Sequence, residues 1–168
     1  MARTASALLR EKPTAPQTNL ACTYATIGRL EEALQMDRDV YSGRLKLDGE
    51  EDKETLIAAC NYANSLENLK RFEETKSLMR KTIPVARRVF GDCNDLTLKM
   101  RQIYARALYE DPNATLDDLR EAVTTLEETE RIARRVFGGE HPLTTVIEDQ
   151  LRDARPALAA RDPPLRGA

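Results

Sequence analysis

Apolar residues recur at intervals of three and four along most of the chain, which is the spacing of amphipathic helices. The clearest stripe is Leu56, Ala59, Tyr62, Ala63, Leu66 and Leu69. A second stripe follows it at Phe72, Thr75, Leu78, Met79, Ile83, Ala86, Val89 and Phe90. The pattern predicts pairs of helices, termed helix A and helix B, joined by short turns, and it predicts no strand.

The helix pairs repeat along the chain. Asn19-Leu20-Ala21 returns 42 positions later as Asn61-Tyr62-Ala63, and residues 28–33 match residues 70–75 at the same offset. The run Ala-Arg-Arg-Val-Phe-Gly at 86–91 recurs at 133–138, an offset of 47. Insertions fall in loops, so the five extra residues are expected in the turn-rich segment 110–115.

Turn and capping residues mark the ends of these helices. Gly49, Gly91 and Gly138 follow each helix B, where a left-handed residue ends a helix. Asp52, Asn94 and His141 stand three positions further on, where an N-cap is needed, and Pro142 suits a first helical position. The expected repeats are 15–52, 53–94 and 95–141, followed by a capping helix 142–161. Together they form a repeat domain over 15–162, with a weakly ordered or helical lead-in at 1–14 and a tail at 162–168.

Charged residues follow the helix ends. The acidic pairs Glu31-Glu32, Glu73-Glu74 and Asp117-Asp118 open the B helices, and the pairs Arg87-Arg88 and Arg134-Arg135 close two of them. The helix macrodipole favours these signs, so we interpret the arginines as solvated capping charges, the alternative being an anion-binding or nucleic-acid patch. Pro84 falls inside a helix B and is expected to kink it.

The charge balance and composition narrow the classes of partner. The 168 residues carry 26 Lys and Arg against 28 Asp and Glu, so no net field attracts nucleic acid or an anionic membrane. No apolar run approaches the ~20 residues of a membrane span. Cys22, Cys60 and Cys93 lie far apart and are expected to be reduced thiols in a cytoplasmic protein. Neither a metal nor a cofactor is expected.

Catalytic signatures are missing from the sequence. It contains no phosphate-binding glycine motif, and His141 occupies a linker where the other repeats have Asp and Asn. The acids lie at helix starts and on polar faces, so none is expected to have a raised pKa. The sequence therefore predicts that the protein is not an enzyme.

The repeat residues resemble a known family. A period of 42 fits HEAT or armadillo arrays as well as lengthened tetratricopeptide repeats. The run from Asn19-Leu20-Ala21 to Tyr24, followed by residues 28–33, resembles the tetratricopeptide core. Gly138-Gly139-Glu140-His141-Pro142 is similar to the linker of kinesin-light-chain-type repeats. The resemblance implies an all-α, right-handed superhelical solenoid of antiparallel helix pairs, with three full repeats and a C-terminal capping helix.

Such solenoids line their concave face with A helices. The residues opposite the core stripe are Thr18, Asn19, Cys22 and Thr26 in the first repeat, Cys60, Asn61, Asn64 and Asn68 in the second, and Lys99, Gln102 and Arg106 in the third. Asparagine is a poor helix former, and its amide can both donate to and accept from a peptide backbone, although these asparagines could equally be ordinary solvated positions. Lys99 and Arg106 favour an acidic peptide.

Two functions remain open from the sequence. The first is a protein-interaction scaffold or adaptor that binds a peptide or protein segment on the concave face. The alternative is a structural protein that self-associates through exposed terminal helices, using Val146, Ile147, Leu151 and Leu158 of the last helix. A monomer or a weak homo-oligomer is expected.

Overall fold

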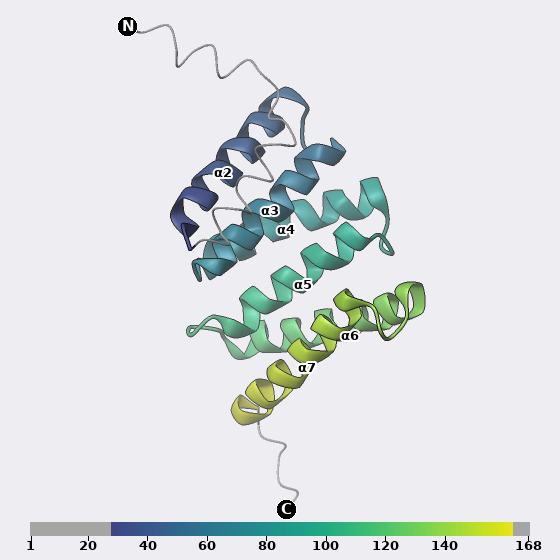
Figure 1. The fold of residues 1–168 in the computed structure, drawn as a ribbon. Coiled ribbons are helices and arrows are strands. Elements are labelled where there is room, and N and C mark those ends of the chain that lie inside the picture. The colour runs from purple at the N-terminus through teal and green to yellow at the C-terminus, as the bar shows by residue number, and fades with distance from the viewer. Residues whose placement is uncertain (1–27, 163–168) are drawn as a thin grey trace, which may run out of the picture. The chain divides into compact units, whose positions relative to one another are not determined.

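The computed structural model describes residues 28–162, and this part of the chain is entirely helical. The helices are α2 (Leu30–Leu47), α3 (Lys53–Asn68), α4 (Phe72–Phe90), α5 (Asp95–Glu110), α6 (Leu116–Phe137) and α7 (Pro142–Arg161) (Figure 1). Short turns connect them. The predicted all-α architecture is confirmed. The helix A of the first repeat lies outside the described residues, and the superhelical handedness stays a prediction.

Contacts between residues divide the chain into two compact units, Met1–Leu69 and Lys70–Ala168. Unit 1 contains α2 packed on α3, and unit 2 contains α4 to α7. Within unit 2 each helix packs on the next, and α5 also contacts α7. These last two are A helices of successive repeats, so unit 2 holds two neighbouring A helices.

The A helices begin at the predicted caps. Asp52 accepts a hydrogen bond at Oδ1 from the Thr55 amide at 3.0 Å, and Asn94 accepts one from the Leu96 amide at 2.9 Å. His141 accepts from the Leu143 amide through Nδ1 at 3.2 Å, with Pro142 as the first helical residue. The imidazole therefore acts as a helix cap, as the linker position predicts.

The B helices end as the glycines predict. Gly91 and Gly138 have φ angles of 89° and 91°, which only glycine adopts without strain. The paired acids lie in the first turns and the paired arginines in the last turns of α4 and α6. Both α4 and α7 continue through their internal prolines, Pro84 and Pro156.

The core of unit 2 joins three helices. Its buried residues are Leu98, Ala105, Val123, Leu126, Ala133, Ile147, Leu151 and Ala154, from α5, α6 and α7. Three of these are alanines, one from each helix, and small side chains let helix backbones approach closely. A hydrogen bond adds to this packing, since the Thr144 hydroxyl donates to the Gly138 carbonyl at 2.9 Å. The core thus fixes α7 against α5 and α6.

The five-residue insertion lies only partly in the predicted turn, because part of it lengthens the start of α6. Helix α5 ends at Glu110 and α6 begins at Leu116. Thr115 caps α6 in a capping box with Asp118, each side chain accepting a hydrogen bond from the other residue's amide. These local hydrogen bonds fix the start of α6, and α5 still packs directly on α6.

Candidate functional site

The side of the A helices predicted to bind a ligand is called the A-helix face. In unit 2 it includes three predicted residues on α5. Lys99 is exposed, and no acid in the described part of the chain pairs with it. Arg106 is half-buried and its Nε lies 2.9 Å from Glu110 Oε1 in an ion pair. Gln102 differs from both, since only 7% of its surface is exposed. The face therefore exposes Lys99 and part of Arg106 next to the acids Asp95 and Glu110, whereas Gln102 is buried beside it and does not line its surface as predicted.

The offset of 47 locates the matching residues on α7. Val146 and Asp149 match Lys99 and Gln102, while Gln150 and Asp153 match Ile103 and Arg106.

Gln150 is a candidate that the sequence reasoning missed. It is 7% exposed, and its Oε1 atom is buried with no hydrogen-bond partner among the described residues. The repeat position of Asn61 is occupied by Ile103 in the third repeat. The series of amides is therefore interrupted there, and the next amide, Gln150, is easily overlooked. Extending the series from Asn61 by two repeats, past Ile103, finds Gln150, so the signal was present in the sequence.

The A-helix face of unit 1 is formed by α3. Asn61 and Asn64 are half-buried and Asn68 is exposed, so all three amides reach solvent. Cys60 is 1% exposed, which makes its prediction as a face residue wrong. Its side chain points into the packed interior, one helical step from the asparagines. The predicted Asn19 and Cys22, with Thr18 and Thr26, lie outside the described residues.

A buried carboxylate in unit 1 contradicts the expectation that no acid has a raised pKa. Asp37 on α2 is 6% exposed and accepts a hydrogen bond at Oδ2 from the Ser65 hydroxyl on α3, at 2.5 Å. Burial raises the pKa of Asp37, and the hydrogen bond from Ser65 opposes that rise. Its single observed partner is a structural contact between α2 and α3, so we assign Asp37 no catalytic role.

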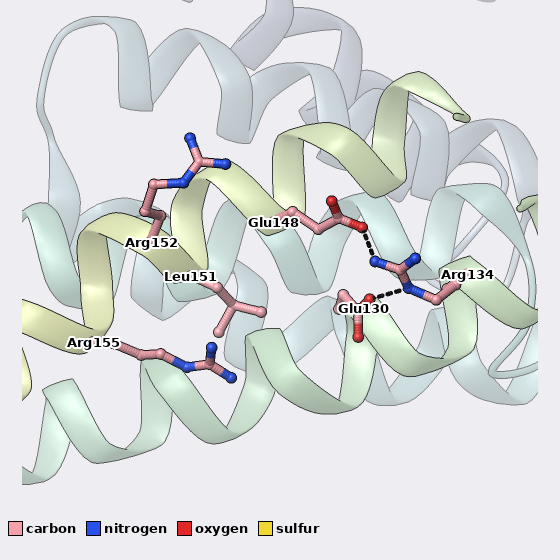
Figure 2. A pocket seen from close by; sticks show the side chains of 6 residues that line it. All are labelled: Glu130, Arg134, Glu148, Leu151, Arg152 and Arg155. Atoms are coloured by element: carbon pink, nitrogen blue, oxygen red, sulfur yellow. Dashed lines mark hydrogen bonds and ion pairs between the residues drawn. The ribbon is translucent and has the colours of Figure 1, made fainter. Parts of the chain in front are cut away.

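A separate cavity lies between α6 and α7, with a volume of about 370 Å³. Its lining residues are Glu130, Arg134, Glu148, Leu151, Arg152 and Arg155. Figure 2 shows Arg134 reaching both glutamates, while Arg152 points away from them. Arg155 forms an ion pair with Glu127 at 2.8 Å, and Arg152 pairs with Asp149 at 3.0 Å. The charges of the cavity are therefore paired within the protein.

The preceding repeat contains a comparable cavity of about 230 Å³ between α4 and α5, with α6 along one side. There, Tyr104 accepts a hydrogen bond from Arg80 Nε at 2.9 Å and donates one to Glu121 on α6 at 2.8 Å. Ala105 and Leu108 are completely buried. Their counterparts on α7 are Arg152 and Arg155, whose side chains are 75% and 60% exposed. The outer face of α7 therefore lacks the apolar residues of α5.

Comparisons with known proteins agree with this repeat geometry. A family model of the tetratricopeptide repeat matches residues 17–51 and 55–93. This part of the chain consists of tetratricopeptide repeats. The matched ranges end before α5, and the offset of 47 extends the repeat through α5 and α6. Repeats of this type are protein-interaction modules, and in general terms this protein is such a scaffold.

Solved structures share the fold. One is a Podosopora anserina protein assigned as a kinesin light chain, with nearly identical TPR-like repeats. It is 20% identical with a TM-score of 0.76, covering 87% of this chain and 68% of that one. Another is BtubC (BKLC) from P. vanneervenii, 15% identical with a TM-score of 0.64, covering 99% of this chain and 78% of that one. No curated protein matches in a sequence comparison. The chain thus resembles kinesin-light-chain-like repeats in fold.

Between residues 28 and 162, no three His, Cys, Asp or Glu side chains come together in a group that could hold a metal ion. No helix in this region is both long and apolar enough to cross a bilayer. The A-helix faces are therefore the features on which we base a function.

Proposed function

We propose that this protein binds extended segments of partner proteins, with the A-helix face of each unit acting as a binding surface of its own. The observation that carries the proposal is the set of amides on these faces. Asn61, Asn64 and Asn68 reach solvent from α3, whereas Gln102 on α5 and Gln150 on α7 are buried beside the face of unit 2. An amide both donates and accepts, so it can hydrogen-bond a peptide backbone whatever the sequence of that peptide.

The basic residues of α5 add a preference for charge. Lys99 is exposed and unpaired within the described residues, and Arg106 forms an ion pair with Glu110 that is itself partly exposed. An acidic side chain of a ligand gains a charge-assisted hydrogen bond from either residue. We infer that an acidic residue of the ligand lies over α5, and that the role of the protein is not catalytic.

The first experiment tests the amides of unit 1. A variant with Asn61, Asn64 and Asn68 changed to Ala is compared with the wild type in affinity capture from a native lysate. The matched control changes Gln35, Arg38 and Asp39 of α2, three exposed polar residues of the same unit, to Ala. A partner retained by the wild type and the control, but lost by the asparagine variant, is then mapped to a segment and titrated directly.

Two outcomes would contradict the proposal. In the first, the asparagine variant retains every partner at wild-type affinity. In the second, the control variant loses the same partners, which assigns the loss to general destabilisation. Circular dichroism of all three proteins verifies that the helix content is equal before binding is interpreted.

The self-association alternative has little apolar surface available on α7. Ile147 is fully buried and Leu151 is 6% exposed, both in the core of unit 2, and Leu158 packs partly against that core. Val146 is the one residue of the predicted four that is classed as exposed, at 44%. Sedimentation equilibrium over a hundredfold range of concentration tests this alternative, because self-association raises the apparent mass.

A further inference from the structure

Two buried glutamines lie along the seam where α5 meets α7. Gln102 is four residues after Leu98 and three before Ala105, and both neighbours belong to the core shared with α7. Gln150 is three residues after Ile147 and four before Ala154, which belong to the same core. Residues three and four apart share one side of a helix. Each glutamine therefore borders the shared core on the side of the A-helix face.

Gln150 lacks a partner that its burial requires. Its Oε1 atom is buried and accepts no hydrogen bond from the described residues, although the residue is 93% buried. An unsatisfied buried acceptor is destabilising, and such groups are rare in native proteins. A backbone N–H of a bound peptide is a donor of the required kind. Because the atom is buried, a peptide N–H reaches it only if the Gln150 side chain rotates toward the seam.

The two walls of the seam differ in charge. The α5 wall has the bases Lys99 and Arg106 together with the acids Asp95 and Glu110, whereas the charged residues at the matching positions of α7 are Asp149 and Asp153. Lys99 and Asp153 are exposed and form no ion pair within the described residues. Arg106 and Asp149 are paired on their own helices, with Glu110 at 2.9 Å and Arg152 at 3.0 Å. An acidic peptide matches the α5 wall and is repelled by the α7 wall.

We propose that the α5–α7 seam selects an extended peptide that carries one acidic and one basic side chain about three residues apart. The acid lies over α5, the base over α7, and the Gln150 amide accepts from the backbone between them. Packed helix axes are about 8–10 Å apart, and an extended chain advances about 3.3 Å per residue, which gives the spacing. This inference rests on the proposed function and replaces a uniformly acidic ligand for this seam with a mixed-charge one.

Synthetic peptides of ten residues test the charge order. Each has neutral polar residues throughout except at two central positions three apart. These hold Asp then Lys, Lys then Asp, two Asp, two Lys or two Gln. Fluorescence anisotropy measures the affinity of each labelled peptide for the full chain. We expect one of the two mixed orders to bind best, by roughly two- to fivefold over the two-Asp peptide, since exposed ion pairs contribute modestly.

Two variants separate charge from backbone recognition. The double variant Lys99→Glu with Asp153→Lys keeps the net charge and reverses the walls, so it is expected to prefer the opposite mixed order. Gln150→Leu is expected to weaken all peptides by a similar factor, because the amide contacts the backbone. The control exchanges Lys81 and Glu140, exposed residues off the A-helix faces, as Lys81→Glu with Glu140→Lys. It is expected to keep the wild-type preference.

The results distinguish this inference from the proposed function. If the two-Asp peptide binds best, or the reversed walls leave the preferred order unchanged, the mixed-charge inference is wrong and peptide binding stands. If no peptide binds and the asparagine variant of unit 1 also keeps all partners, both are wrong. If the preference reverses with the walls, both are supported.

Discussion

Lys76 on α4 forms a buried ion pair with Asp111, the C-cap residue of α5, with Nζ and Oδ2 2.8 Å apart. Their side chains are 4% and 5% exposed. Glu73 also contacts Lys76 Nζ, at 2.5 Å, but lies largely in solvent. The hydrogen bond from Lys76 lowers the pKa of Asp111 despite its burial. Asp111 opens the turn between α5 and α6, so this pair anchors that turn to α4.

Replacing Lys76 by Met should therefore destabilise unit 2. The change leaves the Asp111 carboxylate buried without its counter-charge, and the expected loss is about 2–3 kcal/mol in the free energy of unfolding. Urea unfolding followed by circular dichroism measures it. Lys81→Met, on the exposed side of the same helix, is the control and should change stability by less than about 0.5 kcal/mol. Equal effects of the two changes would contradict the role of the pair.

The same ion pair predicts a pH dependence. The folded-state pKa of Asp111 is lowered, so its contribution to stability is present above the unfolded pKa of about 3.9 and is lost as pH falls through the folded pKa. Asp111→Asn should flatten the fall in stability of the protein below about pH 4. Unfolding midpoints measured from pH 2 to pH 7 test this. An unchanged slope in the variant would show that the acid lability comes from other groups.

Asp37 should make a contribution to the pH dependence of stability that is opposite in sign to that of Asp111. Burial raises its folded-state pKa, so the ionised form weakens the folded state above that pKa, and the penalty disappears below the unfolded pKa. Asp37→Asn retains an acceptor for Ser65 and should be more stable than the wild type at pH 7 but equal to it near pH 3. The control is Asp39→Asn, an exposed acid of the same helix. A variant that is less stable at pH 7 would contradict this reading.

Two adjacent glycines offer a matched test of helix termination. Gly138 has a φ of 91°, and a Cβ added there meets no atom within 4 Å, so Gly138→Ala should cost about 1 kcal/mol through backbone strain alone. Gly139 has no positive φ, and its added Cβ would approach only the flexible end of Arg134, at 3.2 Å. Gly139→Ala should therefore be nearly neutral. Thermal unfolding of both variants decides whether the left-handed residue matters.

The Gln150 amide should lower the stability of the folded protein, even though it is proposed to strengthen peptide binding. Gln150→Leu removes the orphaned acceptor and should raise the free energy of unfolding by about 1 kcal/mol. Gln102→Leu is the control, because Gln102 is equally buried but carries no orphaned atom, and it should gain less. Chemical unfolding of both variants compares the gains. A clear loss of stability in Gln150→Leu would indicate that the amide already has an internal partner.

The candidate site was only partly predictable. Asn61, Asn64 and Asn68 were identified from their recurrence on one side of a helix, and the structure leaves all three in contact with solvent. Cys60 was assigned to the same face but is buried, because a position next to the face can turn inward with the packing of its neighbours. Gln150 was missed because Ile103 broke the series. Periodicity gives the direction of a side chain, and burial depends on what packs against it.

The sequence by itself determined the helices, their period, their caps and the helix pair that contains the insertion. These features depend on residues close together along the chain, such as Asn94 with Leu96 and Thr115 with Asp118, so local chemistry specifies them. Only the tertiary structure decided that Asp37 is buried, that Lys76 pairs with Asp111 across 35 positions, and that Gln150 faces the seam without a partner. Those properties arise where separate helices meet, and no local pattern records which side chain a distant helix covers.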